Sequence, residues 1–74
     1  MKLPRLTGKE VAKIAEKLGF KFIRQVGSHM TYVHADGRKT VIPKHPGEEI
    51  GSGLLNKIIK KELQISREEL KKLL

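Results

Sequence analysis

The residues best suited to chemistry in this chain form the segment Gly27-Ser28-His29, which follows a run of apolar and basic side chains. Histidine titrates near neutral pH, so an imidazole at this position can accept or donate a proton in a reaction. The glycine lets the backbone approach a phosphate closely, and spare N–H groups in such a turn can bind phosphate oxygens. By residue type alone, a histidine in a loop is more often a polar surface residue, so both interpretations stay open.

The other residues that could bind a metal are few. The chain has three histidines, His29, His34 and His45, and no cysteine. A metal site needs several ligands to converge. His29 and His34 lie five residues apart on one predicted strand, so their side chains are expected on opposite faces. We therefore expect no metal and no cofactor.

The net charge of +8 is distributed unevenly along the 74 residues. Residues 1–45 carry +7, whereas residues 46–74 carry only +1. A basic field on one part of a small domain attracts polyanions, and nucleic acid is favoured over an acidic protein; a charge that merely aids solubility is the simpler alternative. RNA also supplies its own nucleophile, the 2′-hydroxyl, so a ribonuclease needs only proton transfer and nearby cations.

Residues 7–20, "TGKEVAKIAEKLGF", predict an amphipathic helix that positions part of this charge. Thr7 and Glu10 have the spacing of a capping box, and Gly19 can end the helix. One apolar stripe is formed by Val11, Ile14, Ala15 and Leu18. A basic ridge is formed by Lys9, Lys13 and Lys17. This ridge either contacts RNA or is simply exposed to solvent.

Three strands and further helices should follow. Residues 20–26, 29–34 and 39–43 predict an antiparallel meander, with a hairpin signal at Asp36-Gly37 and Pro43 ending the last strand. A loop over residues 44–53 precedes a second helix, for which Ser52 is the expected N-cap. Its apolar residues are Leu54, Leu55, Ile58 and Ile59.

A second capping box, Ser66 and Glu69, opens a short last helix. The predicted fold is therefore α+β, an α-β-β-β-α two-layer sandwich like that of double-stranded-RNA-binding domains, with a short extra C-terminal helix. Residues 1–74 should form a single domain. No apolar run approaches the roughly 18 residues of a membrane span, and no signal peptide is evident, so a cytoplasmic protein without membrane contact is expected.

Three segments together resemble a known family. "GSHMTY", "IPKHPGEEIGSGLLNKIIK" and "ISREEL" occur in the order and at the intervals of HicA-type toxins of toxin–antitoxin systems, and the resemblance runs from about Leu6 to the C-terminus. It implies a metal-independent ribonuclease that cleaves mRNA and is neutralised by a HicB-type antitoxin covering its site. The family's catalytic histidine, in its Gly-Ser-His motif, is His29 here.

The remaining candidate residues surround His29 in the sequence or are other histidines. Gly27, Ser28, Lys44 and His45 are expected to help bind RNA. The alternatives are that Ser28 only shapes the turn and that the His45 side chain bonds only to main chain. His34 is expected to be exposed and idle. Aromatic residues make up only 4% of the chain, so RNA should be held through its backbone charge rather than by stacked bases.

Two other functions fit parts of the pattern. A non-catalytic nucleic-acid-binding module would use the same fold and charge without needing His29. A DNA-binding helix-turn-helix over residues 54–74 is disfavoured, because Glu68 and Glu69 would stand where a recognition helix meets phosphates.

Overall fold

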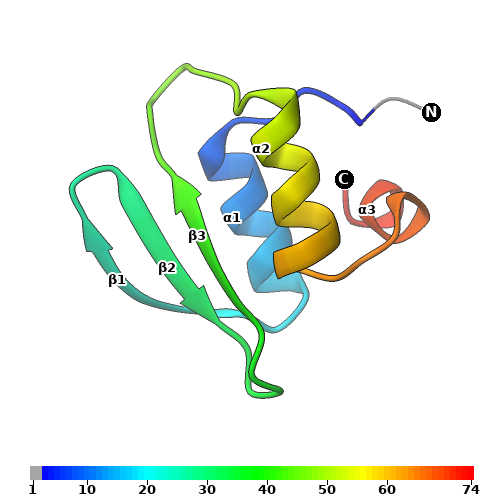
Figure 1. Ribbon diagram of the computed structural model, residues 1–74, viewed down its shortest axis with the longest axis horizontal. Helices are drawn as coiled ribbons and strands as arrows, with labels where there is room; N and C mark the ends of the chain where they lie inside the picture. Colours follow the sequence, from blue (N-terminus) through cyan, green and yellow to red (C-terminus); the bar gives the residue numbers. More distant parts are fainter. Residues whose placement is uncertain (1–2) are drawn as a thin grey trace.

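A three-stranded sheet and a layer of helices make up the computed structural model, which describes residues 3–74 (Figure 1). The elements in chain order are α1 (Gly8–Lys17), β1 (Lys21–Val26), β2 (His29–Val33), β3 (Lys39–Pro43), α2 (Ser52–Lys57), the π-helical turn η1 (Ile58–Glu62) and α3 (Arg67–Leu73). The predicted α-β-β-β-α order is confirmed, and so is the mixed α+β fold of the double-stranded-RNA-binding type. Within the described range, no helix is long and apolar enough to cross a membrane.

Helix α1 begins and ends where the sequence predicts. The Thr7 hydroxyl accepts the backbone N–H of Glu10, and the Glu10 carboxylate accepts the N–H of Thr7 in return, which completes the capping box. The Thr7 N–H and, to a lesser degree, the Thr7 hydroxyl donate to the Glu10 carboxylate and lower the pKa of this carboxyl, with a smaller contribution from Lys13. Gly19 follows the helix with φ +100°, a conformation that glycine adopts without strain.

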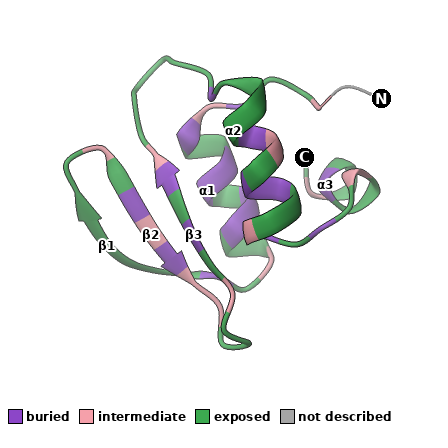
Figure 2. Ribbon diagram, viewed as in Figure 1, coloured by how far each residue is buried: buried purple, intermediate pink, exposed green. Residues whose placement is uncertain are grey.

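The sheet has the order β1-β2-β3 and is antiparallel throughout. Met30 and Tyr32 on β2 are buried and face the helices, together with their β3 partners Thr40 and Ile42. Because side chains alternate along a strand, His29 lies on the opposite face. We call this the outer face of the sheet; no helix covers it, whereas α1 and α2 pack against the inner face (Figures 1 and 2).

One continuous core lies between the inner face and the helices. Every element except β1 contributes a buried side chain, and β1 is exposed along its whole length (Figure 2). The side chains with no more than 2% exposure are mostly aliphatic and come largely from α1 and the α2–η1 region: Val11, Ile14, Ala15, Phe20, Thr40, Ile42, Leu55, Ile58, Ile59, Leu63 and Leu70. The second helix therefore supplies much of the core that holds the sheet in place.

The start of α2 differs from the prediction. Gly51, not Ser52, occupies the N-cap, and no side chain caps the helix. Ser52 is already the first helical residue, so its hydroxyl is one position too late to accept the free N–H groups of the first turn. The predicted apolar stripe is also incomplete, because Leu54 remains 42% exposed.

The π-helical turn η1 connects the helical layer to the edge of the sheet. The N–H of Leu63 donates to the carbonyl of Ile58, five residues earlier. At the end of this turn the Glu62 carboxylate accepts bonds from the Thr40 hydroxyl, 2.6 Å away, and from the N–H of Val41. Glu62 thus occupies part of the free edge of β3 and satisfies the buried Thr40.

The prediction that His34 is exposed and idle is wrong. Its imidazole Nε2 lies 3.1 Å from the carbonyl oxygen of Leu18, and its Nδ1 accepts the N–H of Asp36. The ring packs edge-on against Phe20, with the ring centres 5.2 Å apart. His34 also lies just beyond β2 rather than on it, so the expected strand alternation with His29 does not apply.

The same hairpin holds two further interactions. The Asp36 carboxylate accepts the backbone N–H and side-chain Nε of Arg38. The backbone bond is the main reason why the pKa of the Asp36 carboxyl is lowered. The guanidinium of Arg38 lies over the Phe20 ring and also donates to the Leu63 carbonyl. The hairpin is therefore fastened to the core at its base.

Replacing His34 with alanine should destabilise the protein by about 1–3 kcal/mol, because two hydrogen bonds and a ring contact are lost together. Urea unfolding followed by circular dichroism measures this change. An unchanged unfolding midpoint would contradict the structural role given to this ring.

Candidate active site

A two-residue turn between β1 and β2 presents the Gly27-Ser28-His29 segment. Gly27 has φ +59°, which glycine adopts readily and which suits the first central position of a tight hairpin turn. The side-chain amide of Gln25 donates to the Gly27 carbonyl at 2.9 Å and steadies the turn. The turn thus places His29 at the first position of β2, where its orientation is set by the sheet.

Three segments distant in sequence meet beside this turn. His29 is paired with Pro43 across the sheet, and the next N–H, that of Lys44, donates to the Ser28 carbonyl at 2.6 Å. On the other side of Pro43 lies Gly8, the first residue of α1. A Cβ on Gly8 would lie 1.9 Å from the Pro43 carbonyl oxygen, so only glycine allows this approach. The N-terminal end of α1 is therefore held close to the turn.

The His29 side chain is exposed on the outer face of the sheet, between Val26 and Pro43. No hydrogen bond or ion pair of this side chain occurs among residues 3–74. Its ring is therefore available to an incoming molecule. A hollow of about 750 Å³ lies elsewhere, beside Arg5, Ser52 and Arg67, and His29 does not line it. The open surface around His29 suits a long substrate better than an enclosed small molecule.

The lysine ridge of α1 is brought to this region only in part. Lys9 directly follows Gly8 and so lies at the end of α1 nearest the turn. Lys17 lies about 12 Å further along the helix axis, since each helical residue rises about 1.5 Å. Its ammonium donates to the Leu73 carbonyl at 2.8 Å and so joins α1 to the C-terminal helix. Lys13 is exposed between them, and its charge acts on the neighbouring Glu10.

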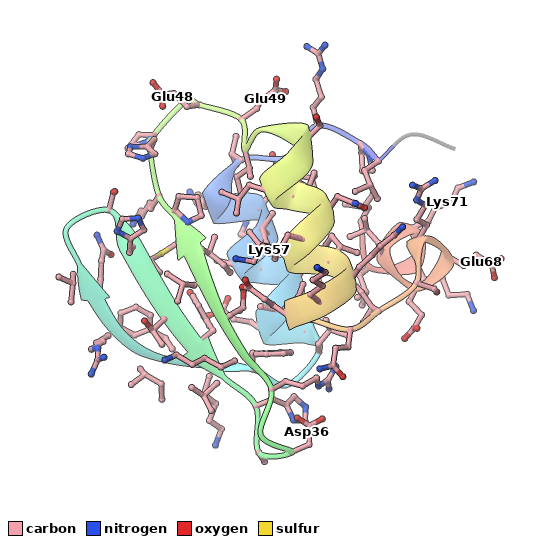
Figure 3. All side chains as sticks on the ribbon, in the orientation of Figure 1. Asp36, Glu48, Glu49, Lys57, Glu68 and Lys71 are labelled. Atoms are coloured by element: carbon pink, nitrogen blue, oxygen red, sulfur yellow. The ribbon has the colours of Figure 1, made fainter. Side chains whose placement is uncertain are left out.

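His45 lies on the exposed loop that leaves β3. Its carbonyl accepts the N–H of Glu48, which forms a turn around Gly47 at φ +78°. The His45 side chain is exposed and makes no hydrogen bond within the described part of the chain. The structure therefore does not have the alternative in which this ring bonds to main chain. Figure 3 places Glu48 and Glu49 along the same loop, where the Glu49 carboxylate lies 3.8 Å from the guanidinium of Arg5.

Two further observations bear on the chemistry available here. No group of three or more His, Asp or Glu side chains in residues 3–74 is arranged to hold a metal ion. Tyr32 faces the core, where burial and, to a lesser degree, the Glu16 carboxylate raise the pKa of its phenol. This ring is therefore not available to stack on a base.

Three exposed cations on the strands escaped the sequence analysis. Lys21, Arg24 and Lys39 occupy outer-face positions in the register of the sheet, the face on which His29 lies. The sequence of residues 39–43 could have placed Lys39 there. Side chains alternate between the two faces of a strand, and Thr40 and Ile42 face the core, so Lys39 must face outward. Arg24 could not be placed, because an irregularity between Phe22 and Arg24 shifts the alternation of β1.

Comparison with known proteins supports the resemblance noted in the sequence. The sequence model of a family described as the HicA toxin of bacterial toxin–antitoxin systems matches residues 8–65, which include α1, the whole sheet, α2 and η1. A search of curated proteins gave no match. The matched region contains the Gly27-Ser28-His29 turn and both segments packed beside it. The chain therefore belongs to the HicA family of toxins of bacterial toxin–antitoxin systems.

Proposed function

We propose that this toxin is a metal-independent endoribonuclease that cleaves mRNA, with His29 as an acid–base group. The observation that carries the proposal is the position of His29: an exposed imidazole without a partner in the described chain, held at the start of a strand by a tight turn. Membership of a toxin family supports an activity that harms the cell. The basic surface supports a polyanionic substrate.

The chemistry requires only groups of the chain and of the substrate. The 2′-oxygen attacks the adjacent phosphorus, the bond to the 5′-oxygen breaks, and the products end in a 2′,3′-cyclic phosphate and a 5′-hydroxyl. One proton leaves the 2′-hydroxyl and one reaches the 5′-oxygen. An imidazole suits either transfer, so His29 performs one of the two.

The residues beside His29 supply the remaining requirements. The exposed ammonium group of Lys44, whose backbone N–H is bonded to Ser28 beside His29, stabilises the extra negative charge on the phosphorane. Gly27 and Ser28 let the backbone approach the phosphate, because the turn carries no bulky side chain. His45 begins the exposed loop next to Lys44 and binds or orients the same phosphate.

The experiment for this function is incubation of purified protein with end-labelled RNA in the presence of EDTA. Cleavage products under these conditions support a metal-independent nuclease. RNA that is shifted in a native gel but remains intact would indicate the binding module instead.

An antitoxin is the partner that this family implies, and we propose that it is of the HicB type and covers the His29 surface. Residues 1–45 carry most of the positive charge, so the partner should present acidic side chains there, which speeds its capture of free toxin. RNA and the partner should then exclude each other.

Titration of RNA into a preformed complex of the partner with the inactive His29→Ala toxin tests this exclusion. Release of the partner by RNA is the expected result. A stable ternary complex of toxin, partner and RNA would contradict direct occlusion.

A further inference from the structure

We propose that a single strand of RNA runs lengthwise along the outer face of the sheet to His29, held by Lys21, Arg24 and Lys39 rather than by the lysine ridge of α1. This inference rests on the proposed ribonuclease function and names the surface that its substrate occupies. Its basis is the register of the three strands, which places these cations and His29 on one uncovered face.

The outer face is built as three successive rows across the sheet. The first row is Val26, His29 and Pro43; the second is Arg24, Thr31 and Val41; the third is Lys21, Val33 and Lys39. Successive rows lie about 6.6 Å apart, because a strand rises about 3.3 Å per residue. This spacing is close to that of consecutive phosphates in an extended strand. Arg24 and the Lys21–Lys39 pair can thus contact phosphates one and two nucleotides from the one at His29.

The charge on this face is free of acidic neighbours. The three strands contain no Asp or Glu, and Lys21, Arg24 and Lys39 form no ion pair in the described part of the protein. Figure 3 shows Asp36 at the hairpin beyond one end of the sheet and Glu48 on the loop beyond the other. Glu62 approaches only the edge of β3, where its carboxylate is bound to Thr40 and Val41.

The ridge of α1 is less favourable to a polyanion. Glu10 and Glu16 stand among its three lysines, so their charges partly cancel. Lys17 is also bonded to the Leu73 carbonyl at the end far from His29. The outer face therefore carries more positive charge that is not balanced by carboxylates than the ridge does. Its cations also lie on the same face as the catalytic histidine.

The shape of the outer face favours a single strand over a duplex. Three strands spaced about 4.8 Å apart give a face about 10 Å wide, which fits one extended chain. Aliphatic side chains on the same face give riboses and bases a surface to pack against; Val26, beside His29, is 67% exposed and Val41, in the row of Arg24, is 38% exposed. An unpaired strand can also rotate its 2′-hydroxyl into line with the bond that breaks.

Three triple variants with the same loss of charge, all in the His29→Ala background, separate the possible surfaces. The first replaces Lys21, Arg24 and Lys39 with Gln, the second replaces Lys9, Lys13 and Lys17, and the third replaces the exposed and remote Lys60, Lys71 and Lys72. Affinity for a labelled, unstructured RNA is measured over a range of salt concentrations. Affinity falls as salt rises, so the slope of log affinity against log salt is negative. Each lost phosphate contact reduces the magnitude of this slope by about 0.7.

The magnitude of the slope should decrease by about 2 in the first variant and by much less in the other two. The inference is overturned if the first variant keeps the parent slope, or if the second loses as much. A hairpin duplex that binds more tightly than the single strand, and whose binding depends on the second variant, would also overturn it. Should the first variant fail to fold, amide NMR shifts of the His29→Ala protein decide: they must change on the strands rather than on α1.

The result is independent of catalysis. If RNA binds along the sheet but the protein that keeps His29 never cleaves it, the nuclease is refuted and the surface is established. If the protein that keeps His29 cleaves RNA but the first variant keeps the salt slope of its His29→Ala background, the surface is refuted and the nuclease stands.

Discussion

Replacing His29 with alanine should lower the rate of RNA cleavage by about 10²–10⁴-fold, the usual contribution of a positioned acid–base group. The side chain is exposed and makes no contact that supports the core, so the free energy of unfolding should change by less than about 0.5 kcal/mol. Initial rates on labelled RNA, together with urea unfolding of the same preparation, measure both quantities. Expression of the variant in cells should correspondingly cease to arrest growth.

Thr31→Ala is a suitable control, because Thr31 lies on the same strand and the same face but has no group that titrates near neutral pH. His34→Ala is unsuitable, since His34 supports the hairpin. The Thr31 variant should cleave at close to the parent rate. Parent-level cleavage or growth arrest by His29→Ala at equal expression would show that another group carries the chemistry.

The largest effect on stability is expected from Gly8→Ala. The new Cβ would stand 1.9 Å from the Pro43 carbonyl oxygen and 3.2 Å from the Lys44 Cα, both backbone atoms that cannot turn aside. Helix α1 and β3 would have to separate, at a cost of about 3 kcal/mol or more. In a domain of this size such a loss lowers Tm by more than about 10 °C. Thermal unfolding followed by circular dichroism measures it.

Gly53→Ala is the matched control for this substitution. Gly53 lies in the first turn of α2, as Gly8 does in α1, but a Cβ there would meet no atom within 4 Å. Alanine favours helix by up to about 1 kcal/mol over glycine, so Tm should rise slightly or stay unchanged. Equal behaviour of the two variants would contradict the close packing of α1 against Pro43.

Local signals in the sequence were sufficient for most of the fold. Both capping boxes, Thr7–Glu10 and Ser66–Glu69, form as predicted, because each involves residues three apart whose bonding needs no distant partner. The bounds of β3 are also as predicted, since Pro43 cannot continue a hydrogen-bonded ladder. The positions of the helices along the chain could be predicted from the spacing of apolar residues alone.

Features that depend on distant contacts could not be predicted. The role of His34 requires Leu18 and Phe20, which precede it by more than ten residues and are brought near only by the folded sheet. The π-helical turn ends where the Glu62 carboxylate accepts the hydrogen bond of the Thr40 hydroxyl. The local sequence pattern gives no sign of this pairing. The outer face of the sheet likewise needed the register of β1, including its irregularity before Arg24. Residue type singled out His29 and the resemblance favoured its catalytic interpretation, but neither pointed to the cations that share its face.

The central claim is that the substrate's own 2′-hydroxyl is the nucleophile, with His29 performing one of the two proton transfers. Its most direct test first maps the bond that the parent protein cleaves in an RNA, in the presence of EDTA, and then replaces the 2′-hydroxyl of that one nucleotide with hydrogen. The account predicts that cleavage at this bond disappears while binding persists, and that the unmodified RNA yields a 2′,3′-cyclic phosphate and a 5′-hydroxyl. Continued cleavage at the 2′-deoxy nucleotide, or cleavage only when a divalent metal is added, would contradict it.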